Sequence, residues 1–302
     1  MLSDDRMPAM NRGWQQQFEE HRPQLRSVAY RMLGSTADAD DALQDAWLRV
    51  NRADISGVDN LVAWLTTVVA RICLDQLRSR RTRGEESLVH VPDPIITLGG
   101  AEDPEASALV ADGVGLALLV VLETLGPDER VAFVLHDTFG VPFDDIAAVL
   151  DKTPAAARKL ASRARQRVST QAPTPDPDLG RQRKVVDAFF AAARDGDLEG
   201  LVSVLHPEVV LRSDGGAARP QLNRLLRGAR VVASQAVLTS ALAPFVRPVL
   251  VNGAAGVVVA PRREAQVVMA FTVVDGAVVA IDVLSDPQRL ASLDLTAVLG
   301  RT

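Results

Sequence analysis

The sequence predicts a multidomain fold: two all-α domains, a helical bundle and a helix-turn-helix, precede an α+β domain with a curved antiparallel sheet. Within residues 14–168, separate segments have apolar residues at helical spacing. After the proline-rich stretch at 172–177, two more helical patterns are followed by valine-rich segments that surround Asn-Gly and Asp-Gly pairs, the usual signals of β-hairpins. At 302 residues the chain is long enough for two or three domains.

Composition limits the classes of protein to which the chain can belong. The hydrophobic fraction of 47% suffices for real cores, and a net charge of -5 argues against a uniformly basic nucleic-acid coat. The single cysteine, Cys73, excludes an internal disulfide, and we interpret it as a small apolar residue inside a helix. No metal and no cofactor is expected. No apolar run reaches the ~20 residues of a bilayer span, and the N-terminus lacks the layout of a signal peptide, so we expect a cytoplasmic protein without membrane contact.

The first two helices differ in the charge of their outer faces. A helix is expected over 14–33, ended by Gly34, and Ser35 followed by Asp38 is typical of the start of a second helix. The outer face of the second helix carries four acids: Asp38, Asp40, Asp41 and Asp45. Two interpretations stay open, because acids near a helix N-terminus compensate the helix dipole and can equally form a docking surface.

A loop over 53–60 leads into a third helix over 61–83, which is apolar in its first half and arginine-rich in its second. Such a helix is anchored at one end and offers the other to phosphates or base edges. The charged residues of this helix are Arg71, Asp75, Arg78, Arg80, Arg81 and Arg83.

Residues 142–168 are typical of two helices joined by a tight turn at 151–153. Thr153 suits the N-cap of the second helix, and Pro154 suits its first position because the missing N–H would have no partner there. Small apolar residues face inward in this second helix, while its outer arc carries Arg158, Lys159, Arg163, Arg165 and Arg167. A helix with these properties can enter a major groove, so we interpret the pair as a helix-turn-helix. The alternative is a solvated basic face on a structural helix pair.

Two segments make a family resemblance specific. The stretch Asp38-Ala-Asp-Asp-Ala-Leu-Gln-Asp-Ala-Trp-Leu-Arg49, followed by Ala63-Trp-Leu-Thr-Thr-Val-Val-Ala-Arg-Ile-Cys-Leu-Asp-Gln-Leu-Arg78, resembles the second conserved region of extracytoplasmic-function (ECF) sigma factors. The helix-turn-helix resembles their fourth region. The resemblance covers residues 14–168 and implies an alternative sigma factor that binds core RNA polymerase, recognises the -35 and -10 promoter elements, opens the duplex and is not an enzyme.

The resemblance also implies roles for individual residues. The acidic face, made of Asp40, Asp41 and Asp45, is similar to the surface that docks on the coiled coil of the largest polymerase subunit, and the fourth region would sit on the flap of the second-largest subunit. A loop over 54–60 would capture an unstacked base. The -10 set is Asn60, Arg71, Asp75, Arg78, Arg80 and Arg81. The -35 set is Arg158, Lys159, Ser162, Arg163 and Arg165, the last of these on phosphate. Trp64 is interpreted as core rather than as a wedge that melts the duplex.

The expected domains are 1–85, a linker over 86–110, 111–170, a proline-rich linker over 171–180, and 181–302. Within the first linker, His90-Val-Pro-Asp-Pro94 resembles the proline-containing linker of sigma factors that carry an extra C-terminal domain, although the aromatic residue usual there is absent. The alternate prolines after Ala172 predict a stiff extended hinge.

The last domain is expected to contain helices over 185–196 and 198–205. Strands are expected over 209–212, 248–251, 256–260, 265–274 and 277–284. The segments Phe189-Phe-Ala-Ala-Ala-Arg-Asp-Gly-Asp-Leu198 and Leu205-His-Pro-Glu-Val-Val-Leu-Arg-Ser-Asp-Gly-Gly216 resemble the start of a SnoaL-like, polyketide-cyclase-type cone. This resemblance implies a domain that modulates the sigma factor in cis and places a regulatory turn at Asp214, Gly215 and Gly216. The subgroup continues that turn with Gly-Lys, whereas this chain has Ala217-Ala218-Arg219.

Two rival functions stay open. The first is a helix-turn-helix regulator that acts without polymerase, for which the acidic face would have no use. The second is a regulator fused to a working cyclase or hydrolase, for which His206, Asp214 and Asp282 are the acid-base candidates, although an Asp before Gly-Gly is ordinarily turn chemistry. A small-molecule ligand of the last domain also stays open.

Overall fold

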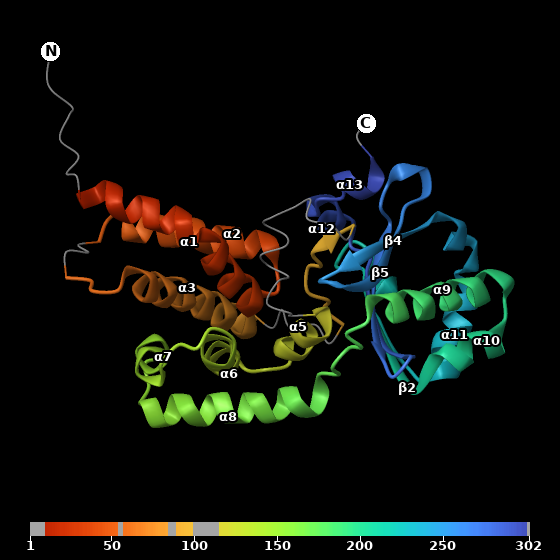
Figure 1. Cartoon of the computed structure of the whole chain (residues 1–302), viewed down its shortest axis with the longest axis horizontal. Coiled ribbons are helices and arrows are strands. Elements are labelled where there is room, and N and C mark those ends of the chain that lie inside the picture. Colours follow the sequence, from red (N-terminus) through yellow and green to blue (C-terminus); the bar gives the residue numbers. More distant parts are fainter. Residues whose placement is uncertain (1–9, 54–56, 84–88, 99–114, 301–302) are drawn as a thin grey trace, which may run out of the picture. The chain divides into compact units, whose positions relative to one another are not determined.

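In the computed structural model of the chain, the structure describes residues 10–53, 57–83, 89–98 and 115–300 (Figure 1). They divide into two compact units, one drawn from 1–84 and 125–166 and the other from 85–124 and 167–302. The two helical regions therefore share one unit, whereas the described linker residues 89–98 and the helix over 116–123 belong with the C-terminal part of the chain.

The first half of the first unit is a three-helix bundle, as the sequence predicts. It consists of α1 (Met10–Leu33), α2 (Thr36–Val50) and α3 (Leu61–Arg83), which lie side by side in Figure 1. The Ser35 side chain accepts a hydrogen bond from the Asp38 N–H at 3.3 Å, so the expected cap is present. Apolar side chains from all three helices are buried in the core, among them Phe18, Leu43 and Ile72.

The second half of the first unit contains the helix-turn-helix. Its elements are α6 (Pro127–Phe133), the π-helical turn η1 (Val134–Thr138), α7 (Phe143–Leu150) and α8 (Pro154–Gln171). Asp151 ends α7 in the left-handed conformation with φ 54°, and the Thr153 hydroxyl accepts a hydrogen bond from the Ala156 N–H at 3.2 Å. Three alanines on the inner side of α8 are completely buried: Ala157, Ala161 and Ala164. The small side chains allow the close packing that the sequence predicts.

The second unit holds a seven-stranded sheet in the order β1-β4-β5-β6-β7-β2-β3. Its strands are β1 (Ile96–Thr97), β2 (Leu205–Asp214), β3 (Arg224–Arg227), β4 (Val246–Val251), β5 (Ala254–Val259), β6 (Val267–Val274) and β7 (Ala277–Leu284). The β4–β5 hairpin turns at Asn252-Gly253 and the β6–β7 hairpin at Asp275-Gly276, each pair with positive φ at both residues. Positive φ at both positions is what a type I′ hairpin turn requires, and the strands on either side are paired, so both predicted hairpins are confirmed.

Three helices pack on one face of this sheet in Figure 1: α9 (Leu179–Asp195), α10 (Leu198–Val204) and α11 (Ala229–Leu238). The unit also contains α5 (Leu116–Glu123), α12 (Pro287–Ser292) and α13 (Thr296–Leu299), with short 3-10 turns η2 (Pro220–Leu222), η3 (Ser240–Phe245) and η4 (Pro261–Arg263). Phe189 on α9 packs edge-on against Phe271 on β6, with ring centroids 5.5 Å apart, in the core between α9–α11 and the sheet.

The sheet differs from the expectation in two respects. Strands β2 and β7 pair in parallel, so the sheet is mostly rather than wholly antiparallel. Helix α11 and strand β3 interrupt the expected run of strands. The parallel pairing has no local sequence signal, because strand pairing depends on contacts between residues that are distant in the sequence. No helix within the described residues has the length and apolar character needed to cross a membrane.

Candidate functional site

The basic half of α3 presents most of the -10 set to solvent. Arg71, Asp75, Arg78 and Arg81 are exposed, and they share this helix with Arg80, which is half-buried. Arg80 forms an ion pair with Asp38, Nη2 to Oδ2 at 2.6 Å, and donates to the Leu33 carbonyl at 3.2 Å. Arg80 thus ties α3 to the start of α2.

Two further arginines of the -10 set contact the helix-turn-helix half of the same unit. Arg71 donates from Nη2 to the Ala148 carbonyl on α7 at 2.7 Å. Arg78 pairs with Asp128 on α6, with Nη2 2.9 Å from Oδ1. The exposed basic face of α3 is therefore not wholly unpartnered in the free chain.

Asn60, the remaining member of the -10 set, caps α3. Its side-chain oxygen accepts from the Ala63 N–H at 3.1 Å, and its carbonyl accepts from the Trp64 N–H at 3.1 Å. Residues 54–56 of the expected base-capturing loop lie outside the described residues. Trp64 is half-buried rather than fully buried, because it lies in the first turn of α3, so its assignment to the core is only partly correct.

The outer face of α8 carries the whole -35 set in exposed positions. The Arg158 guanidinium lies over the Phe143 ring of α7, 5.0 Å from its centroid, and Arg165 pairs with Asp137 at 2.6 Å. The hydrogen bond and charge of Asp137 raise the pKa of Arg165, so that guanidinium stays charged. Within the described part of the chain, Lys159, Ser162 and Arg163 form no hydrogen bond or ion pair. These three side chains are therefore available to a groove without first breaking a contact.

The acidic face of α2 is divided between bound and unbound carboxylates. Arg26 on α1 binds Asp40 through both carboxylate oxygens, at 2.6 and 2.9 Å. Asp41 and Asp45 are exposed and four residues apart, and Leu48, 44% exposed, follows three residues after Asp45 on the same side of the helix. Leu48 was not predicted as part of this surface, although its spacing from Asp41 and Asp45 is a signal for it.

The linker segment, residues 89–98, is bound to the C-terminal sheet rather than extended in solvent. Residues 91–95 of this segment are buried. Arg289 on α12 donates from Nε to Asp93 at 2.7 Å, from Nη1 to Asp214 at 2.8 Å, and from Nη2 to the Val91 carbonyl. One guanidinium therefore holds the linker segment against the turn at the end of β2. Composition alone had indicated only a linker.

Asp214 is the centre of this cluster, which we call the linker clamp: Arg289, Asp93, Asp214 and His90. Its Oδ2 accepts from the Val91 N–H at 3.0 Å and lies 3.4 Å from the His90 ring, and its Oδ1 accepts from the Gly216 N–H at 3.0 Å. Burial raises the pKa of Asp214, but the His90 and Val91 hydrogen bonds, the Arg289 charge and the Gly216 hydrogen bond together lower it to about 2. Asp214 is therefore a carboxylate at any physiological pH.

The linker segment also adds a strand to the sheet. The Ile95 N–H donates to Oδ1 of the Asn252 side chain at 3.0 Å, and the Asn252 N–H donates to the Ile95 carbonyl at 2.8 Å. Beyond Ile95 the two-residue strand β1 pairs with β4 in antiparallel register. Main-chain pairing of this kind is how extended segments dock on exposed sheet edges.

The glycines of the expected regulatory turn fit this geometry. Gly216 has φ 61°, and a Cβ on it would lie 1.7 Å from the Asp286 carboxylate, which caps α12. Only glycine therefore allows the turn and the start of α12 to approach so closely. Arg219, which follows the turn, donates to the Ser285 carbonyl at 3.2 Å. The sequence indicates Asp93 only as part of a linker and Asn252 only as part of a hairpin turn, and Arg289 was not predicted as a site residue.

The acid-base candidates of the second unit are not brought together as a triad. Arg212 forms an ion pair with buried Asp282. Burial raises the pKa of Asp282, and the charge and hydrogen bond of Arg212 lower it by less, so the pKa is raised overall. His206 is exposed, and its Nδ1 accepts from the Glu208 N–H at 3.2 Å. Asp214 is already bound by the linker clamp.

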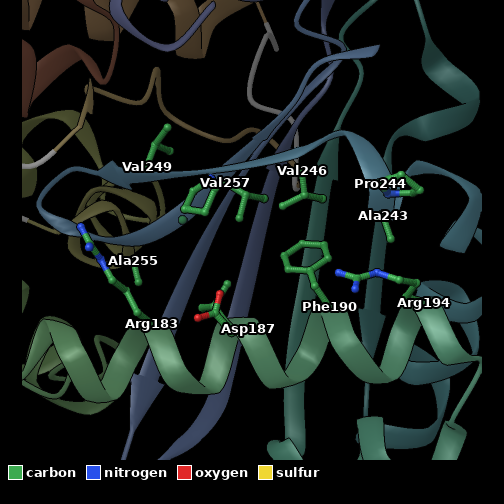
Figure 2. Close-up of a pocket in the computed structure, with 13 residues that line it drawn as sticks. Arg183, Asp187, Phe190, Arg194, Ala243, Pro244, Val246, Val249, Ala255 and Val257 are labelled. Atoms are coloured by element: carbon green, nitrogen blue, oxygen red, sulfur yellow. The ribbon is translucent and has the colours of Figure 1, made fainter.

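A pocket of about 590 Å³ lies between α9 and strands β4 and β5 (Figure 2). Arg183, Asp187 and Arg194 line its helical side, where they form no hydrogen bond or ion pair with any residue in the described ranges. The opposite wall is apolar, with Val246 and Val257 among its side chains. The volume lies within the ~300–1,000 Å³ typical of small-molecule pockets.

Neither thiol nor metal chemistry has a site in the described part of the chain. Cys73 is completely buried, and burial raises the pKa of its thiol to about 12, so it is unreactive. No group of three or more His, Cys, Asp or Glu side chains that could hold a metal ion occurs among the described residues.

Comparison with known proteins matches both halves of the helical unit and the chain as a whole. The family model Sigma-70 region 2 matches residues 17–83, and Sigma-70, region 4 matches residues 115–168. The ECF RNA polymerase sigma factor SigJ of Mycobacterium tuberculosis is 41% identical over 294 residues, 92% of this chain and 94% of that protein. The probable ECF RNA polymerase sigma factor SigI of the same species is 33% identical over 286 residues, 91% of this chain and 94% of that protein. The crystal structure of M. tuberculosis SigJ aligns with a TM-score of 0.73 at 38% identity and covers 93% of this chain and 99% of that one.

Proposed function

Since this chain belongs to the ECF sigma factors of RNA polymerase and is an alternative sigma factor for transcription initiation, we propose which of its surfaces bind polymerase and which bind the promoter. The acidic face of α2 docks on the largest polymerase subunit, and the helix-turn-helix sits on the flap of the second-largest subunit. The -10 set on α3 and the -35 set on α8 bind the promoter. The C-terminal domain, which we regard as SnoaL-like, modulates this activity in cis, in the cytoplasm where the polymerase works.

The proposal for the -35 set rests on the exposed, basic outer face of α8. Replacing Arg158 and Lys159 together by alanine is expected to weaken binding to a -35 duplex by a few kcal/mol, since one good bidentate base contact contributes about 1–3 kcal/mol. Fluorescence anisotropy with promoter and scrambled duplexes checks this. The loss should be larger on promoter DNA than on scrambled DNA, and an unchanged promoter preference would contradict the assignment.

The observation that carries cis modulation is the linker clamp. Residues 89–98 lie in sequence between the -10 set and the -35 set, yet residues 91–95 among them are buried, held by Arg289, Asn252 and the turn at Asp214. Because the C-terminal domain binds the linker segment between the -10 set and the -35 set, it influences how far apart these two sets can move. This contact supports a modulatory rather than a passive role for the domain.

A catalytic role for the C-terminal domain is less well supported. Asp214 is occupied by the linker clamp and Asp282 by Arg212, so neither carboxylate is free to act as an acid or base. The pocket of Figure 2 is instead the place we propose for a small-molecule ligand. Its apolar wall suits the apolar part of an amphiphilic anion, and Arg183 and Arg194, which have no hydrogen-bond or ion-pair partner among the described residues, suit the charged part.

Run-off transcription with purified core polymerase tests the proposal. Removal of residues 172–302 is expected to leave the start sites unchanged and to alter the transcript yield by about fivefold or more, the usual lower limit of a regulatory coupling. A ligand of the pocket should change the yield of the full chain but not that of the shortened one. An unaltered yield would contradict cis modulation, and complete loss on every promoter would contradict a purely modulatory domain.

A further inference from the structure

A second pocket of the C-terminal unit, which we call the α12–α13 pocket, lies against its last two helices. Helices α12 and α13, which Figure 1 shows next to each other, line it together with residues 264–266 and Arg219. Its volume is about 710 Å³, within the ~300–1,000 Å³ typical of small-molecule sites, and it shares no lining residue with the pocket of Figure 2. Four of its lining side chains are leucines: Leu290, Leu293, Leu295 and Leu299. The helical wall therefore suits an apolar chain.

Two side chains of opposite charge line the same pocket without pairing with each other. The Arg219 guanidinium donates from Nη1 to the Ser285 carbonyl at 3.2 Å, and its other N–H groups have no hydrogen-bond partner in the described ranges. The Glu264 carboxylate is exposed and forms no hydrogen bond or ion pair with any described residue. A ligand with a single charge would leave one of these side chains facing a group of its own sign. A ligand with one group of each sign would match both.

We propose that the α12–α13 pocket binds a single-chain amphiphile with a zwitterionic head group. The leucines bind the apolar chain, Arg219 binds the anionic group of the head, and Glu264 binds the cationic group. Burial of the chain supplies most of the affinity, and the two head-group contacts supply the selectivity.

The short helix α12 joins this pocket to the linker clamp. Leu290 lines the pocket, and the residue before it, Arg289, donates to the Asp214 carboxylate at 2.8 Å. Arg219 is connected to the same clamp residue, because it donates to the Ser285 carbonyl while the Ser285 N–H donates to the Asp214 carbonyl at 2.7 Å. A helix of six residues is too short to be stable on its own, so its position depends on such contacts. A ligand in the pocket therefore holds α12 in place and strengthens the linker clamp.

Isothermal titration calorimetry of the full chain with three amphiphiles, each below its critical micelle concentration, tests the site. The probes carry chains of similar length and differ in the head group: decylphosphocholine is zwitterionic, decanoate is anionic and decyltrimethylammonium is cationic. We expect decylphosphocholine to bind about fivefold more tightly than either probe with a single charge, which is the upper contribution of one exposed charge pair.

Substitutions in the pocket should separate the three probes. Arg219→Gln should weaken the binding of decylphosphocholine and decanoate but not of decyltrimethylammonium, whereas Glu264→Gln should weaken the binding of decylphosphocholine and decyltrimethylammonium but not of decanoate. Ala291→Trp fills the pocket from an exposed position of α12 and should block all three probes. Its matched control is Ala297→Trp, at an exposed position of α13 that does not line the pocket. Arg183→Gln, in the pocket of Figure 2, should leave all three affinities unchanged.

Hydrogen exchange reports the coupling to the linker clamp. Saturating decylphosphocholine should raise the protection of peptides that contain Val91 and Ile95, whose N–H groups bind the clamp and the sheet. Because coupling between two equilibria is reciprocal, Arg289→Met, which opens the clamp, should also weaken the binding of decylphosphocholine. The effect of the ligand on transcription rests on the proposed function, in which the linker clamp carries cis modulation.

Three results would overturn the assignment of the pocket: equal affinities for the three probes in every variant, binding that Ala291→Trp leaves intact, or binding that is lost in Arg183→Gln instead. Binding without added protection would overturn the coupling. A failure of the proposed function has a different signature. If decylphosphocholine raises the protection of the linker segment but leaves the run-off yield unchanged, the pocket controls the clamp, and the clamp does not modulate transcription.

Discussion

Replacing Arg289 by methionine is expected to lower the free energy of unfolding of the C-terminal unit by about 3–5 kcal/mol, the usual cost of removing one partner from a buried ion pair. Methionine keeps the length of the side chain but leaves the carboxylates of Asp93 and Asp214, each 5% exposed, without their common cation. The linker segment should then detach from the sheet more often than in the unsubstituted chain.

Hydrogen exchange measured by mass spectrometry checks this result for each unit separately. Peptides that contain Val91 and Ile95 should lose protection, because their N–H groups donate to Asp214 and Asn252. All three tryptophans and the single tyrosine lie in the first 64 residues, so tryptophan fluorescence reports the helical unit alone and should show unchanged unfolding. Arg230→Met is the matched control: it breaks the exposed Arg230–Glu199 pair of the same unit, and such pairs contribute little.

The effect of Arg289→Met should depend on pH in a defined direction. The pKa of Asp214 is lowered from 3.8 to about 2 in the folded chain, so its ionised form stabilises the fold fully above pH 3.8, and that contribution is lost as pH falls towards 2. The difference between the two proteins should therefore be largest near neutral pH and shrink over this interval. A difference that is constant down to pH 2, or protection that is equal in both proteins, would contradict the clamp.

The helical half of the fold could be predicted because its signals are local. Ser35, Thr153 and Pro154 mark helix starts through bonds within a single turn, and the alanines of α8 reveal its inner face by spacing. The same holds for the hairpins, where Asn252-Gly253 and Asp275-Gly276 supply the positive φ that the turns need.

The linker clamp could not be predicted because its members are distant in the sequence. Asp93 and Arg289 are 196 residues apart, and the local pattern around His90 indicates only a proline-containing linker. Parallel pairing of β2 with β7 is hidden for the same reason. Arg71 and Arg78 show a different limit: an arginine-rich helix end suits phosphate, a carboxylate and a carbonyl equally, so the sequence cannot say which one it meets in the free chain.

The acidic face gives the second large expected effect. Reversing both exposed acids, Asp41→Lys with Asp45→Lys, should raise the dissociation constant for core polymerase by at least about a hundredfold, since disrupting an interfacial charge pair costs about 2–5 kcal/mol. Asp40 is left intact because its pair with Arg26 joins α1 to α2, and its loss would confuse docking with folding.

Two controls separate docking from overall charge and from DNA binding. Reversing Asp144 and Asp145, exposed acids of α7, changes the net charge equally and should leave polymerase binding intact. Binding of the reversed Asp41/Asp45 chain to a -35 duplex should match that of the unsubstituted chain, because α8 is untouched. Holoenzyme that still assembles after the reversal would show that α2 is not the docking surface. In that case the acids of α2 only compensate the helix dipole, and the polymerase binds another part of this sigma factor.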